Sequence, residues 1–224
     1  MAEKLYERCA VITGDVVKSS KLPDDLRRKL SDILRKAYAD LKAMAPALFP
    51  EDVLRYPLAV FRGDAIQMVV VEPEYAAHAA VAFRALVLAA SEKPRIELRL
   101  ALGIGPIDFV PGNDVHEGDG EAFRLSGRAL DEMKSSATLA VASETSERQA
   151  ALKTVLSLVD AVTDAWTPNQ ARAVAGAMKG RTQEQIAASW PGKPTSQQNV
   201  WRQLRRAHWD AVHTALEFVR NALR

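Results

Sequence analysis

The chain has 224 residues and a formal net charge of +2, with 48% hydrophobic and 26% charged side chains. This composition supports one large domain or a domain of about 160 residues plus a small one, and it excludes a chain that is disordered throughout. No apolar run reaches the roughly 18 residues that a membrane span requires, and the polar start Met1-Ala2-Glu3-Lys4 lacks the pattern of a signal peptide. We therefore expect a cytoplasmic protein with no membrane partner, and we expect its single cysteine, Cys9, to be a buried structural thiol.

Charge is distributed unevenly along the chain. From residue 166 to the end there are nine lysines and arginines and three acids, a net charge of +6, so the preceding residues carry −4. A basic terminal module on an acidic body is typical of a protein in which one part meets a polyanion.

The first half of the chain predicts strands and helices in alternation. An apolar run over residues 8–13 predicts a buried strand, and apolar residues at helical spacing predict a long helix capped by Asp24. Two strand-like runs within residues 58–71 are separated by Gly63-Asp64-Ala65, which suits a tight hairpin. The alanine-rich residues 74–90 predict a second helix.

The middle of the chain adds a strand over residues 96–104, where apolar and other residues alternate. Gly103 and Gly105 should end this strand, and residues 107–110 should form its hairpin return. A helix over 121–134 and a strand over 139–142 follow.

The order β-α-β-β-α-β predicts the fold class. It favours an α+β, ferredoxin-like or palm-type domain over residues 1–145, with an antiparallel sheet and its helices on one face. Residues 146–165 then form a linker helix, and residues 166–224 a small all-α domain.

Two Gly-Asp motifs are candidates for chemistry. Asp15 follows the first strand and Asp64 lies in the hairpin, so the palm topology would bring them side by side. Carboxylate oxygens are what Mg²⁺ binds, usually together with water and the phosphates of a nucleotide. Gly-Asp is also an ordinary turn dipeptide, and each aspartate could do no more than cap a turn.

Four motifs follow one another along this part of the chain: Gly14-Asp15 with Ser19-Ser20, Phe61-Arg62-Gly63-Asp64, the strand Arg99 to Gly105, and the helix start from Gly120 to Leu130. In this order they resemble the class III nucleotidyl cyclase domain and, more closely, the SatD family of small bacterial proteins. The resemblance covers about residues 8–142 and implies the cyclase-like fold.

The resemblance also implies roles for individual residues. Asp15 and Asp64 match the metal carboxylates, with Arg62 and Gly63 beside them as cofactor-binding residues, and Arg128 matches the transition-state arginine. Two positions depart from the cyclase pattern. Arg124 replaces an asparagine that orients the ribose, and Val60 replaces a base-selecting lysine. Cyclases complete the site across a head-to-tail homodimer, so the resemblance implies a homodimer that binds Mg²⁺ with a nucleotide.

Other titratable residues are weaker candidates. The acidic loop at residues 114–121 lacks the spacing of a calcium site, and we interpret it as a solvated loop. His78, His208 and His213 lie in helical stretches with no partner at ligand spacing, and we interpret them as structural.

The C-terminal residues predict a series of short helices. Thr167-Pro168 opens one helix, and residues 181–190, with Thr182 as cap, form a second. The turn at residues 191–194 leads to a further helix whose Val200 and Leu204 face inward. Residues 181–207 resemble the helix-turn-helix of sigma-factor region 4, in which the last of these helices is the recognition helix. The outward side chains suit a DNA major groove, and the residues expected to bind DNA are Gln197, Gln198, Asn199, Trp201, Arg202, Arg205 and Arg206.

A last amphipathic helix over 208–223 has an apolar stripe that could pair with its copy in a dimer. Together these features predict a bacterial DNA-binding transcriptional regulator whose cyclase-like domain dimerises and senses a nucleotide or metal. The alternatives are a Mg²⁺-dependent nucleotidyl cyclase or transferase controlled by the helix-turn-helix, and a structural dimer with a degenerate site.

Overall fold

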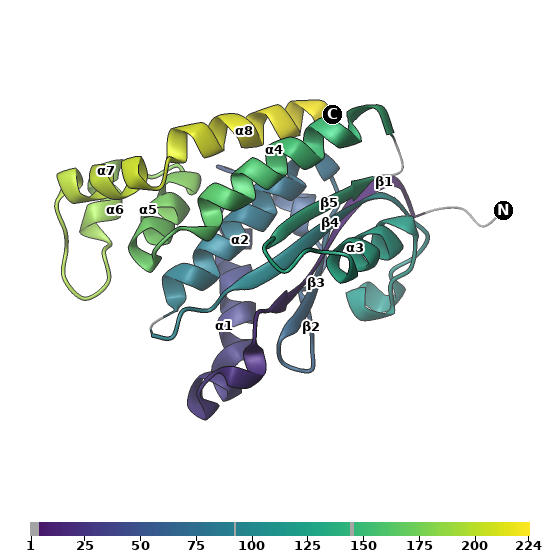
Figure 1. The fold of residues 1–224 in the computed structure, drawn as a ribbon, viewed down its shortest axis with the longest axis horizontal. Coiled ribbons are helices and arrows are strands. Elements are labelled where there is room, and N and C mark those ends of the chain that lie inside the picture. Colours follow the sequence, from purple (N-terminus) through teal and green to yellow (C-terminus); the bar gives the residue numbers. More distant parts are fainter. Residues whose placement is uncertain (1–4, 92, 144–145) are drawn as a thin grey trace.

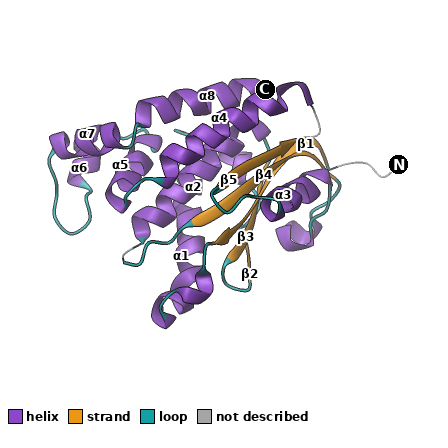
Figure 2. Ribbon diagram, in the orientation of Figure 1, coloured by secondary structure: helices purple, strands orange, loops and turns teal. Residues whose placement is uncertain are grey.

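The computed structural model describes residues 5–91, 93–143 and 146–224 of the chain, which form an α+β protein with a mixed five-stranded sheet (Figures 1 and 2). The strands are β1 (Tyr6–Val16), β2 (Ala59–Phe61), β3 (Ala65–Val70), β4 (Leu98–Ile107) and β5 (Leu139–Ser143). The helices are α1 (Asp24–Lys42), α2 (Ala76–Ala90), α3 (Glu121–Asp131), α4 (Ser146–Asp164), α5 (Pro168–Met178), α6 (Gln183–Ala188), α7 (Gln197–Arg206) and α8 (Trp209–Leu223). The polar start at residues 1–4 and the predicted boundary at residue 145 lie outside the described residues.

The sheet has the strand order β2-β3-β1-β4-β5. The central strand β1 is antiparallel to both β3 and β4, and β5 is parallel to β4. In this register Asp15 lies opposite Ala65 on one side and Arg99 on the other. The end of β1 is therefore flanked by the β2-β3 hairpin and by the start of β4.

The two faces of the sheet are covered by different helices. Ala10 and Ile12 of β1 belong to the main core, which also contains buried residues of α1, α2 and α4. Cys9 and Val11 face the other way, into a smaller cluster with residues of α3. Cys9 is fully buried, as the sequence predicted. Helices were predicted on one face of the sheet only, and this prediction is wrong. Helix α3 covers the second face (Figure 2).

Strand β4 runs through both of its glycines to Ile107, so the predicted break and hairpin return are wrong. A Cβ atom on Gly103 would lie 2.2 Å from the carbonyl oxygen of Ala122 and 2.4 Å from the amide nitrogen of Ser126, both on α3. Gly103 is needed for the close approach of helix to strand. The glycines that suggested a strand end therefore lie where α3 packs against β4.

Helix α2 is the centre of the helical part of the molecule. Most of its residues are buried, and it packs against α1 and the sheet as well as against α5 and α8 (Figure 1). Arg172 of α5 donates to the carbonyl oxygen of Ala89 at 2.8 Å, and Trp166 donates through Nε1 to the carbonyl oxygen of Ala207 at 2.9 Å. Residues of α5 and α8 therefore share one buried core with the sheet.

The apolar stripe of α8 is buried inside the chain. Val212, Leu216, Val219 and Leu223 are at most 3% exposed and belong to the main core. The stripe is not available to pair with a second copy, so that part of the dimer prediction is corrected. The sequence could not distinguish burial against α2 from burial against a partner, because both need the same spacing.

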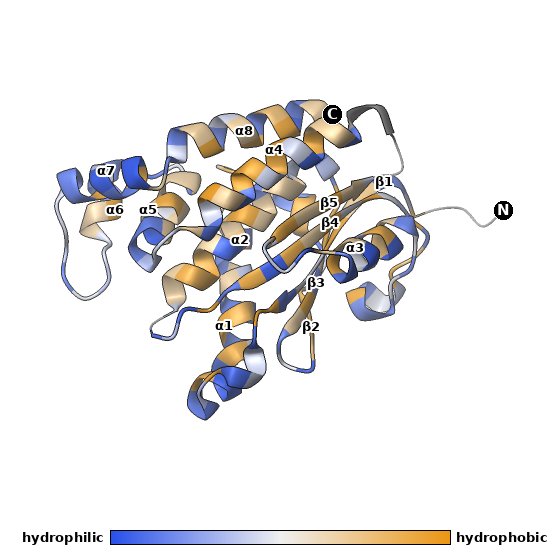
Figure 3. Ribbon diagram, viewed as in Figure 1, coloured by the Kyte–Doolittle hydropathy of each residue, from blue (hydrophilic) through white to orange (hydrophobic). Residues whose placement is uncertain are grey.

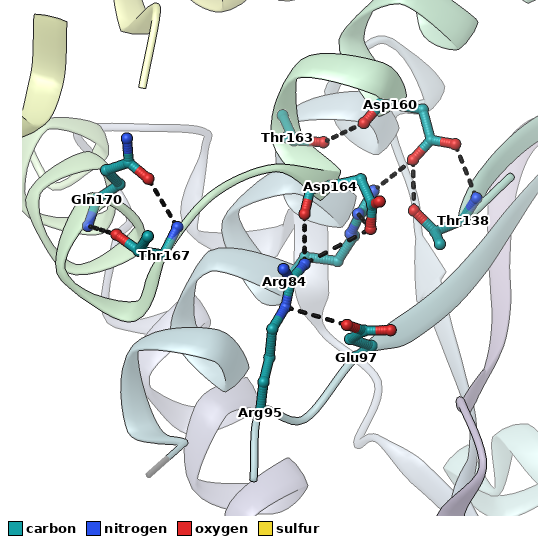
Figure 4. Close-up of polar contacts among 9 residues, drawn as sticks. All are labelled: Arg84, Arg95, Glu97, Thr138, Asp160, Thr163, Asp164, Thr167 and Gln170. Carbon is teal, nitrogen blue, oxygen red and sulfur yellow. Dashed lines mark hydrogen bonds and ion pairs between the residues drawn. The ribbon is translucent and has the colours of Figure 1, made fainter. Parts of the chain in front are cut away.

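A buried polar cluster joins α2, α4 and the start of β5 (Figure 4). Asp160 of α4 accepts hydrogen bonds from the Arg84 guanidinium at 2.9 Å and from the backbone N–H of Thr138 at 2.7 Å. Nearby, Arg95 donates to Asp164. These contacts hold α4 against α2 at the point where the chain enters α5.

None of the described helices is both long and apolar enough to span a bilayer.

Candidate functional site

Helices α6 and α7 form two consecutive capped helices at one end of the molecule (Figure 1). Thr182 caps α6 in a capping box with Gln185, and Ser196 caps α7 by accepting from the backbone N–H of Asn199 at 3.1 Å. Thr167 caps α5 in the same way with Gln170 (Figure 4). Side-chain caps satisfy backbone N–H groups that have no partner in the first turn, which explains why each helix begins where it does.

An apolar cluster holds α7 against α5 and α6. Val200 is fully buried and packs with Ala173 of α5 and with Ile186 and Ala187 of α6. Leu204 is partly buried against the same cluster. The inward residues of α7 are thus the ones that its sequence predicted.

The outward face of α7 is polar and basic, and α7 is among the most hydrophilic segments in Figure 3. Its sequence contains no acidic residue. Trp201 is 47% exposed, and the Arg205 guanidinium lies 5.2 Å from the centre of its indole ring. The predicted DNA-binding residues that are exposed on this face are Gln197, Gln198, Trp201, Arg202, Arg205 and Arg206.

Asn199 differs from the other predicted DNA-binding residues. It is only partly exposed, its amide donates to Oγ1 of Thr195 at 2.9 Å, and its carbonyl oxygen accepts from Gln203 at 3.4 Å. Both ends of its amide are occupied within the chain. Asn199 therefore serves the turn before α7 in this structure.

Part of the positive charge in the C-terminal residues is used for packing. Arg172 reaches the end of α2, and burial lowers the pKa of its guanidinium. Arg220 lies 4.8 Å from the centre of the Tyr75 ring and donates to the Tyr75 hydroxyl at 3.1 Å. The arginines that remain available for a polyanion are concentrated on α7.

The two Gly-Asp motifs lie next to each other, as the topology predicted. The backbone N–H of Val16 donates to the carbonyl oxygen of Asp64 at 3.1 Å. Arg62 is exposed at the tip of the hairpin, and Gly63 has a φ of 89°, a left-handed conformation that favours glycine. The carbonyl oxygen of Gly63 accepts from the Ser31 hydroxyl of α1 at 3.5 Å.

Both carboxylates have partners within the chain. Arg99 of β4 donates through Nε to Asp15 at 2.9 Å and forms a second bond through Nη2, and this pairing raises the pKa of the guanidinium. Asp64 accepts from the Ser19 hydroxyl. The pairing of Asp15 with Arg99 was not predicted, because it depends on β1 and β4 being neighbours in this register.

Arg124 and Arg128 meet at the N-terminal turn of α3. Arg124 donates through Nε to Glu121 at 2.8 Å, and Arg128 donates to the other oxygen of Glu121 at 2.6 Å. Arg124 also pairs with Asp119 at 2.8 Å. Within the described part of the chain these contacts, rather than contacts to Asp15 or Asp64, occupy the two arginines.

Three residues that no sequence pattern grouped, His78, His213 and Glu217, lie together in the structure. Nε2 of His78 on α2 lies 3.1 Å from Oε1 of Glu217 on α8, and His213 stands one helical turn before Glu217. Burial lowers the pKa of His78 to about 4, so the ring is neutral at pH 7. The spacing of His213 and Glu217 by four residues was a signal that the sequence offered. The contribution of His78 depends on how α2 packs against α8.

No protein-family model matches the chain, and no curated protein matches it either. The interpretation of its sites therefore depends on their geometry and on their chemistry.

Proposed function

We propose that this protein is a bacterial DNA-binding transcriptional regulator in which α7 enters the major groove. The observation that carries the proposal is the face of α7, where amide, indole and guanidinium groups are exposed and no carboxylate is present. Arginine pairs with guanine, glutamine pairs with adenine, and further arginines bind phosphates.

The spacing of these side chains supports the proposal. Gln197, Trp201 and Arg205 stand four residues apart, and Gln198, Arg202 and Arg206 repeat the same spacing one residue later. Residues four apart share one side of a helix, so the six side chains form a continuous stripe. Gln197 and Gln198 lie in the first turn, where recognition helices of this type contact bases.

The α+β part is proposed to be the sensing and dimerising domain. The first four strands have the order β2-β3-β1-β4 and arise from a β-α-β-β-α-β chain, which is the arrangement of a ferredoxin-like unit. This arrangement supports the resemblance to the SatD family and to nucleotidyl cyclases. In this proposal Asp15 and Asp64 bind Mg²⁺ with a nucleotide, and a homodimer brings Arg124 and Arg128 of one copy toward the site of the other.

DNA binding by the full-length chain tests the proposal. Fluorescence anisotropy with labelled genomic fragments, repeated at several salt concentrations, should show affinity that falls steeply with salt. The double variant Arg202→Ala/Arg205→Ala should weaken binding at least about tenfold and reduce the salt slope by about 2, since each phosphate contact contributes about 0.9.

A matched control removes two exposed arginines elsewhere. Arg8→Ala/Arg28→Ala changes the net charge by the same amount on β1 and α1. The control should bind DNA as the wild type does. Equal losses in the two double variants would mean that the attraction is not specific to α7, and an absence of binding by the wild type would end the proposal.

The second candidate is a Mg²⁺-dependent nucleotidyl cyclase or transferase, and the adjacency of Asp15 and Asp64 favours it. Incubation of the chain with Mg²⁺ or Mn²⁺ and each nucleoside triphosphate should then give new products, and Asp64→Ala should abolish them. If no product forms, this candidate is wrong. Sedimentation of the chain at several concentrations tests the homodimer separately.

A further inference from the structure

A cluster of His78, His213 and Glu217 lies where α8 packs on α2. Each of the three residues offers one ligand atom, and these atoms all lie within 4.8 Å of one another. The cluster borders a pocket of about 390 Å³ that is also lined by residues of α5 and by Leu48. The three side chains thus meet at an opening between two packed helices.

His78 is a buried polar side chain with an incomplete set of hydrogen bonds. Its side chain is only 3% exposed, and Nδ1 has no hydrogen-bond partner in the described part of the structure. A buried polar nitrogen without a partner destabilises a fold unless it has another use. The nitrogen that faces Glu217 is Nε2, and an imidazole nitrogen is a common ligand of metal ions.

The residues around the cluster orient the proposed ligands. Arg220 donates to Oε2 of Glu217 at 3.4 Å, which leaves Oε1 directed toward His78. The ring of His213 stacks on Trp209 at a centroid distance of 5.3 Å. Hydrogen bonds of this kind hold ligand carboxylates in position at metal sites, and the exposed His213 ring can leave Trp209 to reach an ion.

We propose that His78, His213 and Glu217 bind a divalent transition-metal ion of the Zn²⁺ class, which joins α2 to α8. Two imidazoles and one carboxylate are donors that such an ion prefers, whereas Mg²⁺ and Ca²⁺ prefer sets made of oxygen atoms alone. This site is separate from the Asp15 and Asp64 pair, and it stands whether or not the protein binds DNA.

The geometry is close to that of a bound ion. Ligand atoms at about 2.0–2.1 Å from a tetrahedral ion lie about 3.3 Å apart. Nε2 of His78 and Oε1 of Glu217 are already 3.1 Å apart. His213 is exposed and can rotate to close the remaining separation. Three protein ligands leave the fourth position for water or for a small ligand from the pocket.

The position of the site suggests that a bound ion would link two parts of the molecule. Ala207 and His208 separate α7 from α8, so the helix that carries two of the ligands follows directly after the proposed recognition helix. An ion bound to both α8 and α2 would tie the base of the helix-turn-helix to the α+β core. The site therefore goes beyond the proposed DNA-binding function, because it assigns a metal that holds the two parts together.

Metal titration of the full-length, untagged chain tests the site. After treatment with a chelator and dialysis, calorimetric titration with Zn²⁺ should give about one ion per chain, and Co²⁺ should give a visible absorption band typical of imidazole and carboxylate ligands. His213→Ala and Glu217→Gln should each weaken Zn²⁺ binding at least about 100-fold, the upper end of what loss of a supporting residue causes. Both altered side chains are partly or fully exposed, so these variants should fold.

His208→Asn is the matched control. His208 is an exposed histidine with a φ of 50°, which asparagine tolerates, and it lies outside the cluster. This variant should bind Zn²⁺ as the wild type does, and Zn²⁺ should raise the melting temperature of both proteins but not that of His213→Ala. The proposal is overturned if the wild type binds no stoichiometric Zn²⁺, or if His213→Ala and Glu217→Gln bind it as tightly as the wild type.

Discussion

Nη1 of Arg84 on α2 lies 2.9 Å from Oδ1 of Asp160 on α4, and both side chains are at most 10% exposed. Burial lowers the pKa of the Arg84 guanidinium, and the charge of Asp160 opposes that shift. Asp160 also accepts from Thr138, so one carboxylate connects α2, α4 and the start of β5 (Figure 4). The pair joins elements that are far apart in the sequence, at the junction with the C-terminal helices.

Replacement of Asp160 should destabilise the whole chain. Asp160→Ala leaves a buried guanidinium without its main partner, so we expect the free energy of unfolding to fall by about 3–5 kcal/mol in urea titrations. Asp164→Ala removes a half-exposed carboxylate from the same cluster and should lower it by less than about 1 kcal/mol. Equal effects of the two substitutions would contradict a special role for the buried pair.

The two glycines Gly103 and Gly127 should respond to alanine in opposite directions. Gly103→Ala places a Cβ 2.2 Å from a backbone atom of α3, so either the helix must shift or the strand must bend, and stability should fall by roughly 1–3 kcal/mol or more. Gly127 lies within α3 with open space around its Cα, and Gly127→Ala should raise stability by about 0.5–1 kcal/mol. Urea midpoints measure both. A neutral Gly103→Ala would show that α3 does not need this close approach.

Arg99 should compete with a metal ion for Asp15. The pair is about one third exposed, so it contributes no more than about 1 kcal/mol. If Asp15 and Asp64 bind a divalent ion, Arg99→Gln should strengthen Mn²⁺ binding roughly fivefold, because the ion no longer has to break the Asp15–Arg99 ion pair. Asp15→Asn should weaken it. Electron paramagnetic resonance of free Mn²⁺ gives both affinities, and identical binding by all three proteins would rule out an ion at this position.

Cys9 should be unreactive in the folded protein. It is fully buried, its thiol lies 3.5 Å from the carbonyl oxygen of Gly105, and burial raises its pKa to about 12. The thiolate is the reactive form, so a thiol reagent at pH 8 should label Cys9 only as fast as the chain unfolds. In urea the same residue should react at once and completely. Rapid labelling under native conditions would show that β1 opens locally.

The helical part of the fold could be predicted well because its signals are local. Thr167 and Thr182 were predicted as caps, and each caps a helix in the structure. Ser196 was not singled out, and it caps α7. The helix predicted over residues 146–165 is α4, which ends one residue earlier, at Asp164. Asp24 was expected to cap the first helix, but it is the first residue of α1, and Pro23 holds the cap position.

Predictions failed where a residue's role depends on a distant segment. Gly103 and Gly105 have the chemistry of a turn, and only the approach of α3 shows why they lie inside a strand. The apolar stripe of α8 has the spacing of a dimer seam, but α2 and α4 bury it within the same chain.

Periodicity, caps and charge by themselves determined most of the strands and helices, the adjacency of Asp15 and Asp64, and the polar, basic face of α7. Each of these features depends either on residues that are close together in the chain or on the order of the strands. The spacing of apolar and polar residues along the sequence records both. Only the tertiary structure decided that Arg99 pairs with Asp15, that Arg84 pairs with Asp160, and that His78 meets His213 and Glu217. These pairs depend on which faces of separate elements come together, a result of packing the whole core that no local spacing records.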